Sequence, residues 1–157
     1  MDKTTVLKKI TEALQSELET YIRAAKFSHD EATAEENRAE NKYDTRGLEA
    51  SYLASGQANK VMELEASINA FEELKNKPQN DSVDIGALVE LDQEGSTELY
   101  FIGPAAGGTE VELDGTEILV ITPESPLGSQ LTGLKGGQKN ILDLAGRKQK
   151  VMVKSVT

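Results

Sequence analysis

The sequence predicts a two-part protein of class α + (α+β): a long antiparallel coiled-coil hairpin over residues 1–77, a linker over 78–82, and a small antiparallel-sheet domain with one short helix over 83–157. The first observation is the distribution of glycine and proline, which most often interrupt helices. Residues 1–77 hold two of the 13 glycines and none of the four prolines. The second observation is a helical repeat of apolar residues before position 77, and the third is a set of short alternating segments after it.

Both arms of the predicted hairpin carry an apolar stripe at spacings of three and four residues. The stripe of the first arm is Val6, Ile10, Leu14, Leu18, Ile22 and Ala25, and that of the second arm is Ala54, Ala58, Val61, Leu64, Ile68, Phe71 and Leu74. Such spacings place one narrow apolar face on each helix, as in a two-helix seam. In an antiparallel pair of helices, the residue numbers of two facing residues add up to a constant. The residue numbers of Leu18 and Leu64, and those of Ile22 and Ala58, add up to about 80. The hairpin is therefore predicted to turn near residue 40, with its tip at 36–44.

The stretch 30–49 around this turn is acidic, and its large apolar residues are Tyr43 and Leu48. Its charged residues are Asp30, Glu31, Glu35, Glu36, Glu40, Asp44 and Glu49 against Arg38, Lys42 and Arg46. Clustered carboxylates bind hard cations through oxygen, so the tip can complete the coordination of a metal held mainly by a partner. The alternative is that these charges only keep the surface solvated. The single histidine, His29, fits a solvent-facing helix position better than a ligand position.

The C-terminal part is predicted to be mostly strand. The predicted strands are 83–92, 97–103, 117–122, and a closing hairpin of 139–145 and 148–156 with its turn at Gly146-Arg147. Within 125–138 we expect a short helix that begins at Ser125-Pro126, because proline is favoured at the first helical position. An antiparallel sheet packed on one short helix is an α+β arrangement.

Composition excludes several classes of function. The net charge of −10 and the pI of about 4.6 argue against direct binding to nucleic acid, including sequence-specific DNA binding, and against an anionic membrane surface. No cysteine is present, and no apolar run approaches the ~18–20 residues of a membrane span. We therefore expect a soluble cytoplasmic protein without a membrane segment. The glycine-rich segments 103–108 and 135–137 lack the Lys-Ser/Thr pair of a phosphate-binding loop.

Charge is unevenly distributed over the C-terminal part. Residues 78–124 carry eleven acidic residues and no basic one, whereas residues 125–157 carry six basic residues and one acidic residue, Asp143. The contrast marks a docking surface unless neighbouring strands mix the two signs in space.

Two motifs resemble the Gre transcript-cleavage factor family (GreA/GreB) of bacterial RNA polymerase. The segment ITPESPLGSQLTGLKGGQ at 121–138 is similar to the family's strand, Ser-Pro-Ile/Leu-Gly/Ala, short amphipathic helix and glycine or lysine turn. The segment AENKY at 39–43 resembles the family's Glu-Asn-x-x-Tyr run and is one residue shorter. Length, domain order and the proline-containing linker also agree, so the resemblance covers nearly the whole chain.

The resemblance implies an FK506-binding-protein-like (FKBP-like) fold for 83–157 and docking of this domain at the rim of the secondary channel of RNA polymerase. In the family the hairpin enters that channel, and its tip carboxylates help to hold the second catalytic Mg²⁺. The resemblance therefore implies a protein that is not itself an enzyme and acts on the catalytic activity of the polymerase. It implies no cofactor of its own, apart from Mg²⁺ shared with the polymerase active site. We expect the chain to act as a monomer.

Individual residues are assigned by their match to the family motifs. Glu40 matches the tip glutamate, whereas Asn37 stands three residues earlier, where the family has aspartate. A second alignment uses Glu36 as the tip glutamate and places Thr33 at the acidic position. The predicted catalytic residues are Glu40, Glu36 and Asp44, and the shared Mg²⁺ is assigned to Glu40 and Asp44. The predicted partner-binding residues are Ser125, Pro126, Leu127, Gly128, Gln130 and Tyr43.

Three alternatives stay open. The first is a regulator or inhibitor that occupies the secondary channel without stimulating cleavage, because an asparagine such as Asn37 binds Mg²⁺ less well than a carboxylate. The second is a prolyl isomerase or chaperone, for which the C-terminal domain offers only Tyr100 and Phe101 as aromatic pocket residues. The third is an adaptor that joins other coiled coils through the hairpin.

Overall fold

The computed structural model describes residues 1–33, 46–78 and 80–157, without the side chains of residues 25, 28, 29, 31–33 and 46–55. The predicted tip at 36–44, with Glu36, Glu40, Tyr43 and Asp44, lies outside the described residues, as does the side chain of His29. The chain divides into two compact units, one formed by Met1–Ala13 with Asn69–Thr157 and the other by Leu14–Ile68.

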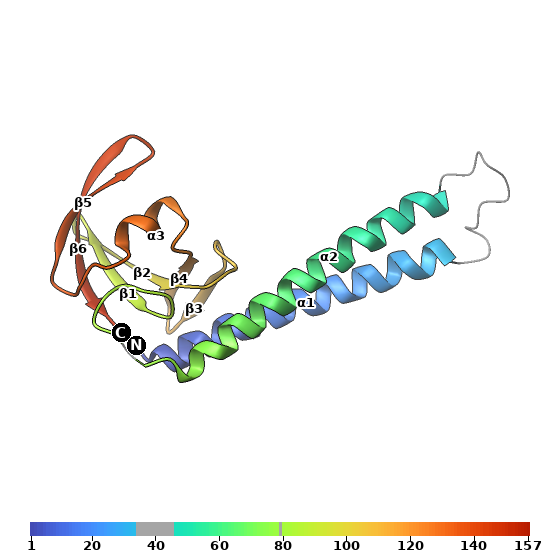
Figure 1. Ribbon diagram of the computed structural model, residues 1–157, viewed down its shortest axis with the longest axis horizontal. Helices are drawn as coiled ribbons and strands as arrows, with labels where there is room; N and C mark the ends of the chain where they lie inside the picture. The colour runs from blue at the N-terminus through green and yellow to red at the C-terminus, as the bar shows by residue number, and fades with distance from the viewer. Residues whose placement is uncertain (34–45, 79) are drawn as a thin grey trace. The chain divides into compact units, whose positions relative to one another are not determined.

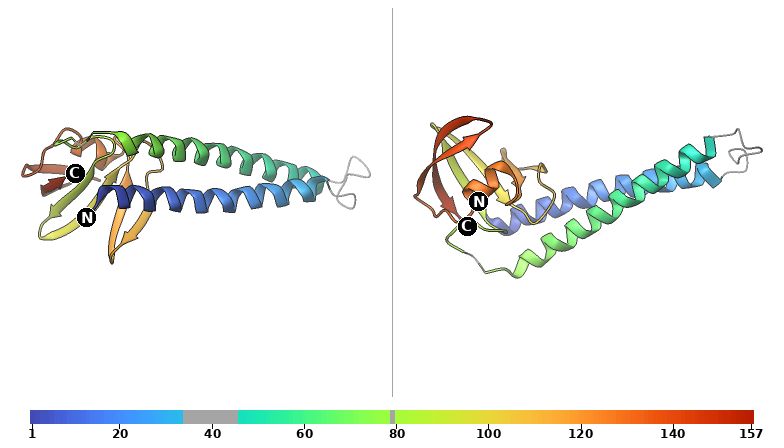
Figure 2. Two further views of the ribbon diagram at one scale, coloured as in Figure 1. Left: turned by 90° about the horizontal axis from the view of Figure 1, so that it is seen from below. Right: turned by 45° about the horizontal axis from the view of Figure 1, so that its top comes forward.

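The described residues of the unit Leu14–Ile68 belong to two helices, α1 (Lys3–Thr33) and α2 (Arg46–Glu73), whose other ends belong to the second unit. The two helices lie side by side in every view (Figures 1 and 2). The Lys60 ammonium lies 5.9 Å from the centroid of the Tyr21 ring, a contact from one helix to the other. The numbers of these two residues also sum to about 80, which agrees with the predicted antiparallel register.

The assignment of Ile22 and Ala58 to the seam between the helices is wrong. Ile22 is 44% exposed and Ala58 is exposed, while Tyr21 and Lys60 are half-buried. A coiled-coil seam advances by alternating steps of three and four residues, so the step of three from Leu18 reaches Tyr21. Each residue turns the helix by about 100°, and this rotation carries the next side chain, Ile22, out of the seam.

The second unit combines the N-terminal part of α1 and the C-terminal end of α2 with the sheet. Helix α2 is followed by a 3₁₀ turn, η2 (Leu74–Asn76). Val6 and Ile10 from α1 and Phe71 from α2 are fully buried. The rings of Phe71 and Phe101 have centroids 6.0 Å apart and are tilted by 35°. The aromatic pair therefore joins the end of α2 to the sheet within this unit.

Six strands form one sheet: β1 (Leu88–Gln93), β2 (Ser96–Ile102), β3 (Glu110–Leu113), β4 (Thr116–Ile121), β5 (Lys139–Leu144) and β6 (Arg147–Val156). Their order is β3-β4-β2-β1-β6-β5 (Figure 1). The sheet is mixed, because β2 and β4 are parallel while the other neighbouring pairs are antiparallel. The predicted wholly antiparallel sheet is therefore wrong in this one pair.

The parallel pair follows from the path of the chain after β2. The chain crosses to the sheet edge and forms β3, a strand of four residues that the sequence reading missed. The turn at Asp114-Gly115, with both φ angles positive, then brings β4 back into the place between β3 and β2. Because β4 is the second strand after β2, it runs in the same direction.

Two predicted boundaries also differ from the structure. Strand β1 begins at Leu88 rather than at residue 83, because Gly86 has a φ of 93° and the Asp84 carboxylate accepts the Ile85 N–H at 2.7 Å. The closing hairpin turns at Ala145 and Gly146, one residue earlier than predicted. Both turn residues have positive φ, as two-residue hairpin turns of the mirror-image type require.

One core cluster of this unit lies on one face of the sheet, while Phe101 packs against Phe71 on the other. The cluster includes Val89, Leu91, Ile102, Leu142 and Val153, each essentially inaccessible to solvent. Helix α3 (Pro126–Leu131) covers this face through Leu131, which is fully buried in the same cluster. The FKBP-like assignment stays a prediction. In the described ranges no helix has an apolar stretch of the length that crossing a membrane requires.

Candidate docking site at the start of helix α3

The motif that resembles the family's docking segment forms the turn from β4 into α3. Ser125 is the N-cap residue of α3: its Oγ accepts the Gly128 N–H at 3.0 Å. The same hydroxyl donates to the Thr122 carbonyl at 2.7 Å, and the Ser125 N–H donates to that carbonyl at 3.0 Å. A serine cap satisfies an N–H that the helix itself leaves unpaired. Ser125 therefore both starts the helix and ties it to the end of β4.

Pro126 and Gly128 each fit a specific demand of this turn. Pro126 occupies the first helical position, where its missing N–H costs no hydrogen bond, and it is exposed. Gly128 is buried, and a Cβ on it would lie 1.9 Å from the Thr122 carbonyl oxygen. The turn therefore presents Pro126 on a backbone that is fixed by the hydrogen bonds of Ser125 and by the close packing of Gly128 against Thr122.

Gln130 holds α3 against the edge strand β5. Its amide nitrogen donates to the Asp143 carbonyl and to the Pro126 carbonyl, each at 2.8 Å, and its amide oxygen accepts the Asp143 N–H at 2.7 Å. The side chain thus takes both backbone groups of Asp143 that a further strand would use. Contact of Gln130 with a partner stays a prediction, but the structure gives it a clear role within the domain.

We expect Gln130→Ala to expose the backbone of Asp143 and to destabilise the contact of α3 with β5 by about 1 kcal/mol, the usual net contribution of such hydrogen bonds. The Asp143 amide should exchange its hydrogen about fivefold faster, measured by NMR. Gln130→Glu keeps the acceptor for the Asp143 N–H but loses the donor to the Asp143 carbonyl at neutral pH, so it should keep part of the protection there and recover more in acid, where a protonated carboxyl can donate. Unchanged exchange at Asp143 in Gln130→Ala would contradict this role.

The segment 125–131 suits recognition rather than acid–base chemistry. It contains no titratable side chain. Leu127 is half-buried and packs against the core cluster. The predicted binding residues of this motif, Ser125, Pro126, Leu127, Gly128 and Gln130, all lie on this one short element and its cap, and their contact with a partner stays a prediction. The sequence reading missed the carbonyl of Thr122 and the backbone of Asp143, because backbone groups have no signal in the sequence.

The aromatic residues of the domain do not form the open pocket of an isomerase. Phe101 is 1% exposed and packs on Phe71. Tyr100 is 6% exposed, and its hydroxyl donates to Glu98 and accepts from Gln93. Burial, and next the neighbouring Glu98, raises the pKa of the Tyr100 phenol above its ordinary value. Tyr100 is therefore a neutral, hydrogen-bonded part of the core.

Among the described residues, no group of three or more histidine, aspartate or glutamate side chains has the arrangement of a metal site. The metal assignment to Glu40 and Asp44 falls on residues outside that description and stays a prediction.

No protein-family model matches the chain, and no curated protein matches it either. Among solved structures, it resembles GreA factor homolog 1 (Gfh1) of Thermus thermophilus, at 21% identity over 94% of each chain with a TM-score of 0.38. It resembles Gfh1 of Thermus aquaticus at 20% identity over 95% of this chain and 92% of that chain, with a TM-score of 0.40. The elongation factor GreA/GreB from Nitrosomonas europaea matches at 19% identity over 64% of this chain and 90% of that chain, with a TM-score of 0.34. These three solved structures are of Gfh1 and GreA/GreB transcription factors.

Proposed function

We propose that this chain is a Gre-like transcription elongation factor that binds RNA polymerase and is not itself an enzyme. The observation that carries the proposal is the turn at Ser125–Gly128. The residues that resemble the family's docking motif form a capped turn with an exposed proline, Pro126, at its start. Such a turn presents a preorganised surface, so little conformational entropy is lost when a partner binds. The domain would dock at the rim of the secondary channel through this turn.

The acidic tip of the hairpin would then enter the channel. We assign Glu40, with Glu36 and Asp44, as the carboxylates that reach the polymerase active site, and Tyr43 as a residue that packs the tip or contacts the polymerase. Glu40 and Asp44 would hold a Mg²⁺ ion together with the polymerase, and such an ion would supply stabilisation of the charge on the attacking and leaving oxygens during cleavage of backtracked RNA. The contribution of this chain is to supply carboxylate oxygens to the polymerase active site at the end of a slender helical hairpin.

A second candidate is a regulator that occupies the channel without stimulating cleavage. Asn37 favours it, because this residue stands where the family carries aspartate and an amide oxygen carries no formal charge for Mg²⁺. The two candidates share the docking turn and differ in what the tip does.

Docking is tested with Pro126→Glu and bacterial RNA polymerase in a binding assay. Glutamate is tolerated in the first turn of a helix because it complements the helix dipole, so this variant should fold. We expect it to weaken binding by about tenfold or more, as placing a charge in a desolvated contact does. Ser129→Glu, with the same charge on the exposed side of α3, is the matched control and should bind within about twofold of the parent. Equal binding of both variants and the parent would refute docking through this turn.

The role of the tip is tested with a stalled, backtracked elongation complex. We expect the parent chain to make the polymerase shorten the RNA from its 3′ end, and the triple variant E36A/E40A/D44A to bind normally without causing this shortening. Shortening that survives the triple substitution would exclude the tip carboxylates. Binding of the parent without any shortening would favour the non-cleaving regulator.

A further inference from the structure

The outer face of the β5–β6 hairpin carries a basic and apolar patch. In the register of the two strands Ile141 faces Lys150, and Lys139 faces Met152. Cross-strand partners lie on the same face of a sheet. The residues between them, Leu142 and Val151, are buried in the core on the other face. Lys139, Ile141, Lys150 and Met152 therefore share the face opposite the cluster that α3 covers, and we name them the outer patch.

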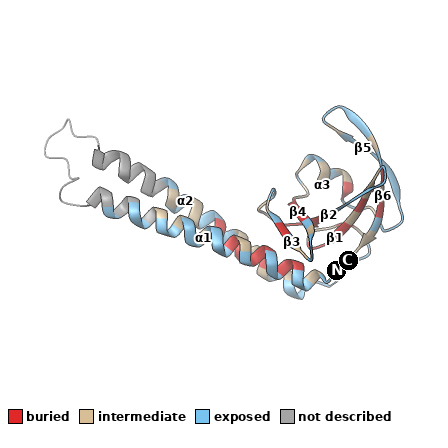
Figure 3. Cartoon of the chain, turned by 180° about the vertical axis from the view of Figure 1, so that it is seen from behind, coloured by how far each residue is buried: buried red, intermediate tan, exposed pale blue. Residues whose placement is uncertain are grey.

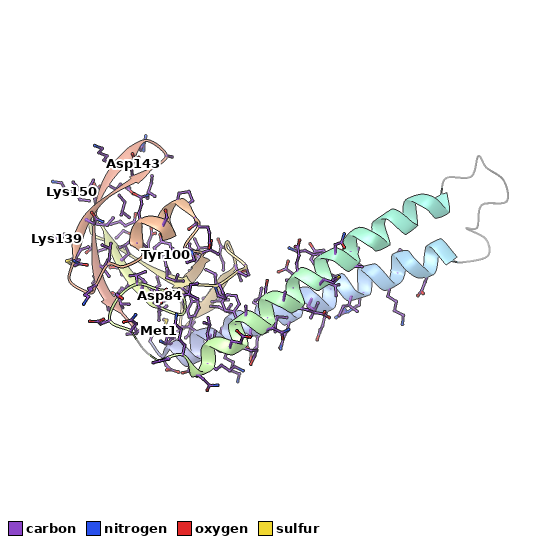
Figure 4. The ribbon with its side chains drawn as sticks, viewed as in Figure 1. Met1, Asp84, Tyr100, Lys139, Asp143 and Lys150 are labelled. Carbon is purple, nitrogen blue, oxygen red and sulfur yellow. The ribbon has the colours of Figure 1, made fainter. Side chains whose placement is uncertain are left out.

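The outer patch is exposed to solvent and lines a groove. Ile141 is 58% exposed although it is a large apolar residue. A groove of about 650 Å³ runs over the patch and is bordered on the β1 side by Asp92 and Glu94. Most of β5 is exposed in Figure 3, and Figure 4 labels Lys139 and Lys150 on this hairpin. The groove therefore joins an apolar floor to basic side chains on β5 and β6 and to acidic ones on the β1 side.

Within the described ranges, the two lysines of the patch are not held in ion pairs, although Asp92 and Glu94 border the same groove. Lys154, nearer the middle of the sheet, pairs with Glu90 at 2.9 Å, and this bond lowers the pKa of the Glu90 carboxyl. No ion pair is formed by Lys139 or Lys150 among the residues that the structure describes. The strand order also places β5–β6 and the acidic β3–β4 pair at opposite edges of the sheet. The charge contrast of the sequence therefore persists in space, on a chain whose net charge is −10.

The free edge of β5 is protected, so a ligand would use the side chains of the patch and not extend the sheet. The Ile141 N–H donates to the side-chain oxygen of Asn140 at 2.8 Å, and Gln130 binds both backbone groups of Asp143. An edge whose backbone groups are already bound offers little to an added strand.

We propose that the outer patch binds an acidic, amphipathic peptide segment of a partner protein. Apolar side chains of that segment would cover Ile141 and Met152, and its carboxylates would pair with Lys139 and Lys150. RNA fits less well, because the patch has no aromatic side chain on which bases stack. The patch lies on the opposite face of the sheet from α3, so this inference does not rest on the function proposed above.

The test uses the full chain and a fluorescein-labelled synthetic peptide of glutamate and leucine, with leucine at every third or fourth position so that one helical face is apolar. We expect saturable binding by fluorescence anisotropy that weakens as salt is added, because exposed ion pairs are screened. The variant K139E/K150E should bind about tenfold more weakly or worse, since like charges then face each other across the contact. Ile141→Ser should weaken binding about fivefold by removing apolar contact area.

The matched control is K8E/K26E, which makes the same change of net charge at exposed positions of α1 and should bind within about twofold of the parent. Circular dichroism should show that all variants fold, because every substituted side chain is exposed. If both double variants weakened peptide binding equally, the weakening would come from the net charge of the chain and not from the outer patch, and the proposal would be overturned. It would also be overturned by no saturable binding at millimolar peptide, or by tighter binding of a polyuridine oligonucleotide that K139E/K150E abolishes.

Discussion

Replacing Gly128 by alanine is expected to destabilise the domain by about 3 kcal/mol or more, at the upper end of the cost of overpacking. The added Cβ would lie 1.9 Å from the Thr122 carbonyl oxygen and 2.8 Å from the Ser125 Oγ. Neither group can rotate away, because one is backbone and the other is the cap of α3. The backbone must therefore move, which breaks the bond from the Gly128 N–H to Ser125. Urea denaturation followed by far-UV circular dichroism measures the loss.

Gly136→Ala is the matched control for this experiment. A Cβ at Gly136 would have its nearest neighbour at 3.8 Å, the Cα of Ser155, which is ordinary contact. This variant should change the free energy of unfolding by no more than about 0.5 kcal/mol, as surface substitutions usually do. Gly128→Ala should also lose polymerase binding if the turn docks as proposed. Equal stability of the two variants would show that the turn relaxes around the added methyl group.

Phe71→Ala is expected to lower the free energy of unfolding by about 3–5 kcal/mol, the usual cost of removing a buried phenylalanine ring. Phe71 is 0% exposed, and its ring meets that of Phe101 at 6.0 Å between centroids. Gly103 also lies against it, since a Cβ there would come within 2.8 Å of the Phe71 ring. Removing the ring leaves a cavity between the end of α2 and strand β2. Urea denaturation measures the loss, and the NMR signals of Phe101 should shift.

The chain offers its own control for Phe71 in Phe27. Phe27 lies on α1 and is 69% exposed, so Phe27→Ala removes the same atoms without leaving a cavity. We expect this variant to stay within about 0.5 kcal/mol of the parent. A loss for Phe71→Ala no larger than that for Phe27→Ala would mean that the aromatic pair does not join helix and sheet.

Features that depend on neighbours in the chain could be predicted from the sequence alone. The helical repeat, the strand segments and the start of α3 at Ser125-Pro126 are of this kind, because periodicity and capping act within a few residues. The docking turn could be recognised for the same reason, since Ser125, Pro126 and Gly128 interact with one another and with Thr122. The assignments to Glu36, Glu40, Tyr43 and Asp44 stay predictions.

Other features required the tertiary structure, because they bring together residues that are distant in the chain. The parallel pairing of β2 with β4 depends on where β3 joins the sheet, and no local pattern encodes that choice. The role of Gln130 depends on Asp143 lying at a free sheet edge, and the exposure of Ile22 depends on the phase of two helices against each other. The outer patch arises in the same way: Lys139, Ile141 and Lys150 share one face only once β5 pairs with β6. Local forces thus determined the elements, and packing between distant elements decided which side chains meet and which remain for a partner.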